Sequence, residues 1–501
     1  MDNLDILKYR QDAEQFLSLL EKEYYMHFSG KKDTLETGWI YSQSQLFSRQ
    51  NIDYFIKKSK ENSPDKKKYA YLLKFCTENF LQKNVQHLKE SIAGDEARCR
   101  VEIEGETVPF RYLDILLPNE PDKNKRDRIE ALRNKILADR LNPNLLKYWN
   151  NLHQQAKYLG FKNYSSLFSY LKGEEFGVTL SEMEELVGQT QDIYEQHFGR
   201  LLKQRLGLDF SQSRRSDFAY LKRGKEYDHF FKKHYLVNAF TETLGYLGID
   251  IYKQKNIHFD IETRENKSPR AFCCAARIPQ EIYLVIMPSG GQDDFNSLFH
   301  EGGHAQHFAH TSPGIDFEYR FLGDNAVTEG YAFLMESLLE DKDWLTCFLG
   351  MDEDAARSFI YFNSLLKLWY CRRYAGKLKY ELRLHDGSGI EGKQTDYATI
   401  LSDISLMKYD KESYLQDVDE GFYCTNYIRA WMFEAQLREY LVKKFGYKWH
   451  RKKESGDFLR EIWSYGQKYD LNELSGQLGC RMDVNFLINS LSENILSYKM
   501  I

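Results

Sequence analysis

The chain has 501 residues, of which 42% are hydrophobic and 29% charged, proportions that are ordinary for a soluble globular protein. Its net charge of −5 at pH 7 and its pI near 6.3 exclude the strongly basic face that nucleic-acid binding requires, and they give no attraction to an anionic membrane. The sequence contains no run of about 18 apolar residues and begins without a basic region followed by an apolar stretch, so we expect neither a membrane span nor a secretory signal.

The eight cysteines are spread through the chain without any Cys-x-x-Cys spacing. This usage is typical of reduced, mostly buried thiols in an intracellular protein. We therefore expect a cytoplasmic protein whose fold does not depend on disulfide bonds.

Long amphipathic stretches dominate the first half of the chain, and proline is scarce, with nine residues. Apolar residues recur at helical spacing, which predicts helices over residues 4–27, 126–140, 143–160 and 181–206. Ser181 followed by Glu184 has the pattern of a capping box, so we expect the last of these helices to begin at Ser181.

Strand signals are few and lie near the middle of the chain. Residues 100–112 alternate polar and apolar side chains around a glycine, which predicts a hairpin. Residues 257–262 and 281–287 predict two further strands, and the second ends at Pro288. From about Asp293 the sequence returns to helical periodicity almost to its end. The predicted class is therefore mainly α with a small sheet.

Two histidines four residues apart form the most informative motif. His300 and His304 would lie one turn apart on a helix and could direct both imidazoles at one ion. Glu301 lies about 100° further round that helix, close enough to activate a water molecule without binding the metal itself. Composition alone predicts roughly 0.05 matches to His-(Asp/Glu)-x-x-His in this chain, so a chance pair of surface histidines is the weaker interpretation.

A catalytic zinc site needs three protein ligands and one open position. The predicted helix over residues 325–339 is mostly apolar, yet it contains Glu329 and Glu336, seven residues apart on one face. Glutamates on an apolar helix are costly to bury unless they are paired or bind a metal. We therefore expect Glu329 to be the third ligand. Glu336 has two interpretations, as an acceptor for a ligand imidazole N–H or as the partner of a nearby arginine.

These residues resemble the thimet oligopeptidase and oligoendopeptidase family. The family motif is His-Glu-x-Gly-His-x-x-His, which here is His300, Glu301, Gly303, His304 and His307. The third ligand of that family lies 29 positions after the first histidine, which is the position of Glu329, and Glu336 also falls on a family glutamate. The similarity covers about residues 250–495, including the stretch 260–272 that leads to the family's substrate-side strand and the C-terminal helices over 456–491.

A second resemblance, to the angiotensin-converting-enzyme-like peptidases, lies at residues 426–429 and the aromatic-rich helix after them. Both families carry a tyrosine that hydrogen-bonds the tetrahedral intermediate, but the corresponding position here is Ala430. A histidine expected a few residues upstream is also missing from residues 411–422. Tyr423 and Tyr427 remain at a spacing that suits one helix face, so we expect one of them to donate to the oxyanion, with core packing as the alternative.

The resemblance implies a large helical ellipsoid of the gluzincin type, with a deep central channel and a small sheet beside the zinc helix. We expect one integrated catalytic unit over residues 1–501, because no linker separates domains. Within it, residues 1–250 form a mostly helical N-terminal part and residues 251–501 the zinc-binding catalytic part. The narrow channel implies a zinc-dependent oligopeptidase with one Zn²⁺ per chain, acting on short unstructured peptides.

Three further residues, Tyr283, His307 and Arg429, are expected to contact the substrate. The strand over 281–287 would hold an extended peptide by main-chain hydrogen bonds.

Two alternatives stay open. A carboxypeptidase or dipeptidyl carboxypeptidase of the same fold would hold the substrate C-terminus with Tyr427 and Arg429, and a catalytically impaired relative would only bind peptides. The expected partners are peptide substrates, without nucleic acid or membrane, and the sequence does not indicate an oligomeric state.

Overall fold

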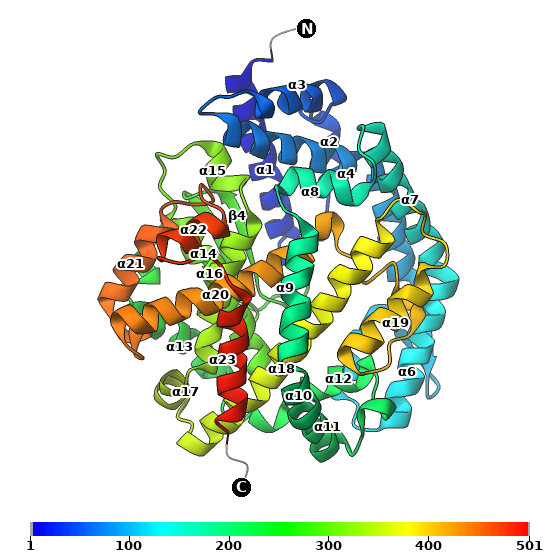
Figure 1. The fold of residues 1–501 in the computed structure, drawn as a ribbon, viewed down its shortest axis with the longest axis vertical. Coiled ribbons are helices and arrows are strands. Elements are labelled where there is room, and N and C mark those ends of the chain that lie inside the picture. Colours follow the sequence, from blue (N-terminus) through cyan, green and yellow to red (C-terminus); the bar gives the residue numbers. More distant parts are fainter. Residues whose placement is uncertain (1–3, 499–501) are drawn as a thin grey trace. The chain divides into compact units, whose positions relative to one another are not determined.

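A computed structural model describes residues 4–498 of the chain, which is mostly helical (Figure 1). Residues 1–3 and 499–501, which the predicted catalytic unit includes, lie outside the described residues. The prediction of a mainly α protein with a small sheet is confirmed. Among the described residues, every helix is either too short or too polar to span a lipid bilayer.

The chain divides into two compact units, each drawn from segments that are far apart in sequence. The first unit comprises Met1–Asn79, Lys225–Tyr361 and Arg429–Ser490, and the second comprises Phe80–Gly224, Phe362–Ile428 and Leu491–Ile501. The sequence predicted one integrated unit with an N-terminal part over residues 1–250 and a catalytic part over residues 251–501. Each of the two compact units contains residues of both parts.

The first unit contains the His-Glu-x-x-His motif, which is predicted to bind a metal. Its helices are α1 (Ile6–Phe28), α2 (Thr37–Gln43), α3 (Arg49–Lys60), α13 (Lys233–Tyr246), α14 (Gln292–His310), α15 (Phe317–Phe321), α16 (Asn325–Glu336), α17 (Lys342–Leu349), α21 (Lys453–Trp463) and α22 (Leu471–Gln477). Four helices contain residues of both units, namely α4 (Lys66–Arg98), α18 (Glu353–Leu384), α20 (Cys424–Phe445) and α23 (Val484–Leu496).

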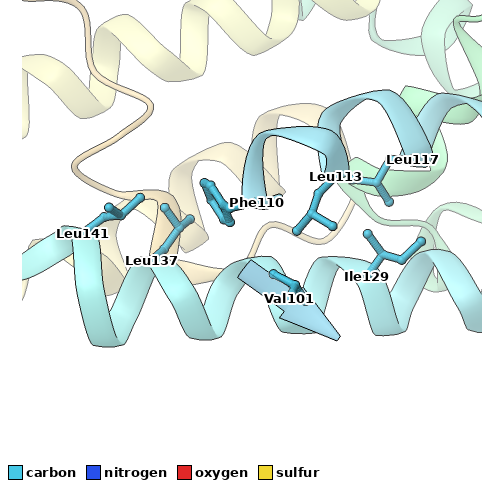
Figure 2. Packing of buried hydrophobic residues seen from close by; sticks show 7 residues of the cluster. All are labelled: Val101, Phe110, Leu113, Leu117, Ile129, Leu137 and Leu141. Atoms are coloured by element: carbon cyan, nitrogen blue, oxygen red, sulfur yellow. The ribbon is translucent and has the colours of Figure 1, made fainter. Parts of the chain in front are cut away.

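The second unit is also helical. Its helices are α5 (Leu113–Leu116), α6 (Lys123–Ile136), α7 (Asn142–Tyr158), α8 (Tyr164–Lys172), α9 (Phe176–Gln189), α10 (Gln191–Ile193), α11 (Gly199–Leu206), α12 (Arg215–Leu221) and α19 (Lys393–Ser405). The predicted hairpin is present as β1 (Arg100–Ile103) paired antiparallel with β2 (Glu106–Pro109). One buried cluster packs this hairpin against α5 and α6, as Figure 2 shows for Val101, Phe110, Leu113, Leu117, Ile129, Leu137 and Leu141.

The predicted helix over residues 181–206 is wrong in two respects. Helix α9 begins at Phe176 after the N-cap Glu175, so Ser181 lies inside a helix and does not cap one. The helical path is then interrupted by a π-helical turn over Tyr194–Phe198. Within this turn the rings of Tyr194 and Phe198 are buried and stacked, with centroids 4.9 Å apart.

The small sheet of the first unit has the strand order β3-β5-β4. Strand β3 (Ile257–Asp260) runs parallel to β5 (Glu281–Val285), and β4 (Phe272–Arg277) runs antiparallel to β5. Both predicted strands are therefore present, but β5 is central and β4 forms one edge. Helix α1 covers one face of the sheet, where Tyr25 stacks on Tyr283 with ring centroids 3.8 Å apart.

Candidate metal centre and catalytic site

Three side chains of the first unit bring their donor atoms together. His300 and His304 lie on α14, and Glu329 lies on α16. Oε2 of Glu329 is 3.3 Å from Nε2 of His300 and 3.7 Å from Nε2 of His304. The three ligand atoms all lie within 4.8 Å of one another. The residues chosen from sequence spacing thus converge on one point between two helices.

The other nitrogen of each imidazole has its own partner. Nδ1 of His300 is 2.9 Å from Oε2 of Glu336, and Nδ1 of His304 is 2.8 Å from Oγ1 of Thr328. When each Nδ1 carries the hydrogen and donates it, both Nε2 lone pairs point at the shared site. Of the two interpretations of Glu336, the structure therefore supports the acceptor for a ligand imidazole.

The electrostatics of the cluster favour a cation. Burial alone would lower the pKa of His300, but Glu329 and Glu336 together raise that pKa well above its usual range. Burial lowers the pKa of His304 to about 4, which keeps this imidazole neutral and able to act as a ligand. The carboxylates of Glu329 and Glu336 carry more negative charge than the two imidazoles can balance, because the imidazole of His304 is neutral. A metal ion would balance this excess.

The donor set fits zinc. Two nitrogens and one carboxylate oxygen are typical catalytic zinc ligands, and tetrahedral bonds of about 2.0–2.2 Å place neighbouring ligand atoms about 3.3–3.6 Å apart. The separations of 3.3 and 3.7 Å from Glu329 Oε2 are close to that range. Three donors leave the fourth coordination position for water or substrate.

A glycine lets the two ligand-bearing helices approach closely. At Gly303 on α14, a Cβ atom would lie 2.6 Å from the Cα of Ala332 and 2.9 Å from the carbonyl oxygen of Tyr331, both on α16. Contacts this short involve backbone atoms that cannot rotate away. Gly303 therefore allows α16 to bring Glu329 close to the two histidines.

Glu301 lies beside the cluster on the same helix. Burial raises the pKa of Glu301 to about 7, with the charge of Glu329 as a further cause. A carboxylate with a pKa near neutrality is well matched to transferring a proton.

Two residues predicted to bind substrate instead support the site from inside the protein. His307 is fully buried, its Nε2 is 3.3 Å from the carbonyl oxygen of Gly466, and it cannot reach a substrate. The guanidinium of Arg429 is also buried and forms a two-pronged ion pair with Asp324, at 2.7 and 3.2 Å. Asp324 caps the N-terminus of α16, so Arg429 helps to hold the helix that carries Glu329.

The predicted role of the strand over residues 281–287 is wrong. As the central strand, β5 already pairs on both sides, with β3 and with β4, so its main chain has no free edge for a peptide. The ring of Tyr283 stacks on Tyr25 of α1. Its hydroxyl donates to Glu281, two residues earlier on β5, at 2.6 Å. In the order β3-β5-β4, the outer edges of the sheet belong to β3 and β4.

Tyr423 and Tyr427 belong to the second unit, whereas the metal cluster belongs to the first. Their rings contact each other, with centroids 5.3 Å apart, and Tyr427 also contacts Tyr374. Ala430 is fully buried in α20. A role for either tyrosine in stabilising an oxyanion stays a prediction.

The sequence analysis missed one residue that touches the site, Thr328. This residue directly precedes Glu329, so its position on the helix was the available signal for a contact with His304.

A second group with metal-binding side chains lies in the second unit, at Glu381, Asp419 and Cys424. The ammonium of Lys377 is 2.8 Å from Oδ1 of Asp419 and 3.9 Å from Oε1 of Glu381. The thiol of Cys424 donates to Glu381 at 3.3 Å. This cluster thus already contains its cation, and it is a buried ion-pair network.

Comparison with known proteins shows the fold. No family model matches the chain, and no curated protein matches it. Among solved structures, it is similar to a protein assigned as an oligoendopeptidase F in Bacillus anthracis str. Ames, with a TM-score of 0.68 and 14% identity over 99% of this chain and 97% of that one. It is similar to PZ peptidase A with an inhibitor, with a TM-score of 0.66 and 15% identity over 99% and 98% of the two chains.

A third similar structure is a protein assigned as a peptidase in Chlamydophila abortus. Its TM-score is 0.64 and its identity 13%, over 98% of this chain and 89% of the other. At these identities the likeness shows a shared fold over almost the whole chain. The structural neighbours are peptidases, and the residues of the metal cluster provide the chemical argument that follows.

Proposed function

We propose that this protein is a zinc-dependent peptidase that hydrolyses short unstructured peptides, with one zinc ion per chain at His300, His304 and Glu329. The observation that carries the proposal is the convergence of these three donors next to a fourth residue, Glu301, that binds none of them. The shared fold with peptidases supports the same reaction class.

The proposed chemistry is hydrolysis of an amide bond. When bound, zinc polarises the scissile carbonyl and lowers the pKa of its water towards about 7. The carboxylate of Glu301 accepts a proton from the attacking water and then delivers it to the nitrogen of the leaving amine. Glu336 and Thr328 hold the two imidazoles. Tyr423 or Tyr427 is proposed to donate to the oxyanion.

The alternatives differ in what they require of the structure. A carboxypeptidase that uses Arg429 to bind the substrate C-terminus is not favoured, because Asp324 already pairs with that guanidinium in the interior. A catalytically impaired peptide-binding relative is favoured by one observation, the buried Ala430 at the position of the expected tyrosine. Such a protein would bind zinc and peptides without turnover.

Two substitutions test the proposal directly. We expect the purified protein to contain about one zinc per chain, and His300→Ala to lose most of it. Glu301→Gln should keep the zinc and lose turnover of a quenched peptide library by roughly 100-fold or more, because a base can be removed without opening the coordination shell. Asp293→Asn, an exposed acid at the start of the same helix, is the matched control and should retain both. Full zinc loading in His300→Ala would remove the site assignment, and near wild-type turnover in Glu301→Gln would remove the base.

A further inference from the structure

Residues 464–467, which follow α21, lie along the connection between the two helices that carry the proposed zinc ligands. The backbone N–H of Ser312, just after α14, donates to the carbonyl oxygen of Ser464 at 3.0 Å. The backbone N–H of Gln467 donates to the carbonyl oxygen of Tyr319 at 2.7 Å. Main-chain hydrogen bonds therefore tie this segment, which we call the brace, to the connection between α14 and α16.

The brace also binds a side chain of α14. Nε2 of His307 is 3.3 Å from the carbonyl oxygen of Gly466. A carbonyl oxygen only accepts, so this nitrogen carries the hydrogen and donates it. Among the described residues, Nδ1 of the same imidazole has no hydrogen-bond partner. The bond to Gly466 is therefore the hydrogen bond that orients this fully buried ring, three residues after His304.

Glycine is required at position 466 for steric reasons. Its φ of +56° lies in the left-handed region. A Cβ atom there would lie 2.7 Å from the carbonyl oxygen of Tyr319 and 3.0 Å from the side chain of Ile315. The absence of a side chain at Gly466 thus lets the brace lie directly against the connection between the two helices.

The side chain of Gln467 reaches the start of α16. Its Oε1 accepts from the backbone N–H of Gly323 at 3.1 Å, and its Nε2 donates to Oδ1 of Asn325 at 3.3 Å. A Cβ atom at Gly323 would lie 2.4 Å from the Cβ of Gln467, so the two segments are in direct contact. Gln467 is only 2% exposed, so removing its amide would leave the N–H of Gly323 without a ready replacement partner.

Packing and hydrogen bonding control different movements of α16. The close contact at Gly303 limits how near α16 can come to α14, but van der Waals contact does little to prevent one helix from sliding along the other. Hydrogen bonds are directional and weaken when donor and acceptor move apart. Because the brace is bonded to α14 through His307 and to α16 through Gln467, it opposes such sliding.

We propose that the brace fixes the position of Glu329 relative to His300 and His304, with His307 and Gln467 as its positioning residues. The inference rests on the proposed zinc site and deepens it, since neither positioning residue is one of the three proposed ligands. It also gives the last histidine of the motif a role, because His307 ties α14 to a residue 159 positions later in the chain.

Zinc affinity tests the two residues separately. His307→Leu removes the donor to Gly466, and Gln467→Met removes both amide bonds, so we expect each to raise the zinc Kd roughly 3- to 30-fold in competition with a chromogenic chelator. His307→Gln should restore most of the affinity, because its amide nitrogen can donate in place of Nε2. The control is Thr243→Val, which removes the hydroxyl that accepts from Trp344 Nε1 at 2.9 Å. This buried bond joins α13 and α17, and its loss should leave the Kd unchanged.

Two further measurements separate positioning from a general loss of stability. All of the variants that lose a bond, Thr243→Val included, should lower the unfolding temperature of the metal-free protein. With Co²⁺ in place of zinc, visible absorption reports the ligand geometry, and it should change in His307→Leu and Gln467→Met but not in Thr243→Val. If one variant fails to fold, the other still decides.

The outcomes distinguish the brace from the zinc site. Wild-type zinc Kd and Co²⁺ absorption in folded His307→Leu and Gln467→Met would overturn the inference and leave the proposed function intact. His307→Gln binding zinc no better than His307→Leu would exclude the bond to Gly466 as the cause. A wild-type protein that binds neither metal would instead remove the proposed zinc site, and the inference with it.

Discussion

Glu336 contacts a residue of the proposed zinc site without being one of its three proposed ligands. Its carboxylate accepts the Nδ1 hydrogen of His300 and so turns the Nε2 lone pair towards the site. The arrangement also increases the basicity of that imidazole, since the two carboxylates raise the pKa of His300. In the proposed zinc site, both Glu329 and Glu336 would therefore affect how strongly His300 binds the ion.

Replacing Glu336 by glutamine should weaken zinc binding without abolishing it. The amide oxygen can still accept from Nδ1, but the charge that supports the imidazole is lost, so we expect the zinc Kd to rise roughly 10- to 100-fold. Competition with a chromogenic chelator measures the change. Glu242→Gln, an exposed glutamate on α13, is the control and should leave the Kd unaltered. An unchanged Kd in Glu336→Gln would mean that the carboxylate contributes only local packing.

The residues of the metal cluster were accessible from the sequence because their spacing is local. His300 and His304 share a helix, and Glu329 follows on the next long one, so helical periodicity and the cost of burying a glutamate identify all three. Gln467 was not accessible in this way. It lies 144 positions after Gly323, its partner at the start of α16, and no periodic pattern encodes such a tertiary contact.

At the scale of elements, the close approach of α14 and α16 brings the ligands together. Gly302 and Gly303 follow Glu301, but only Gly303 faces the backbone of α16. A Cβ at Gly302 would instead meet the ring of Phe240. Gly302 therefore leaves space for a side chain of α13, and Gly303 leaves space for the backbone of α16.

Gly303→Ala should separate the two helices and weaken both folding and metal binding. Because the added methyl group meets backbone atoms, we expect a loss of about 1–3 kcal/mol in unfolding free energy and a weaker zinc Kd. Thermal unfolding with and without zinc gives both numbers. Gly245→Ala on α13, where a Cβ meets nothing within 4 Å, should be neutral or stabilising. Wild-type stability and zinc affinity in Gly303→Ala would show that the helices tolerate a wider spacing.

The edge strand β4 was not predicted from the sequence. Residues 272–277 read Phe-Cys-Cys-Ala-Ala-Arg, in which small and weakly polar side chains give no alternation. One face of β4 packs under α1 and the other towards α14, so both faces favour small apolar residues. The resemblance placed a substrate-side strand after residue 272, but the periodicity favoured 281–287. The pairing order, which local sequence does not reveal, decides between them.

At the scale of the whole chain, the first 79 residues belong to the same unit as the metal-binding segments. Helix α1 covers the sheet through the stacked rings of Tyr25 and Tyr283, and its Glu21 lines a cavity together with Ala275 of β4. The N-terminal segment therefore belongs to the same compact unit as the candidate site.

The last prediction concerns the size of the substrate. The proposed substrates are short peptides whose residues would bind in an extended conformation next to the metal cluster. A folded protein would have to release each of these residues from its own contacts, and reordering them at the site costs about 1–2 kcal/mol per residue. Folded domains should therefore resist cleavage, while unstructured peptides shorter than about 20 residues should be cut.

A mass-spectrometric time course with a folded domain and its own tryptic peptides in one tube makes the comparison direct. The peptides should disappear while the intact domain persists, and the zinc-loaded Glu301→Gln protein should leave both unchanged. A destabilised core variant of the same domain provides the matched substrate, because its sequence is nearly identical and only its unfolded population is larger. It should be cleaved in proportion to that population. Equal rates for the folded domain and its peptides would mean that the metal cluster is reached from an open surface, and the restriction to short peptides would then have to be abandoned in favour of a general protease.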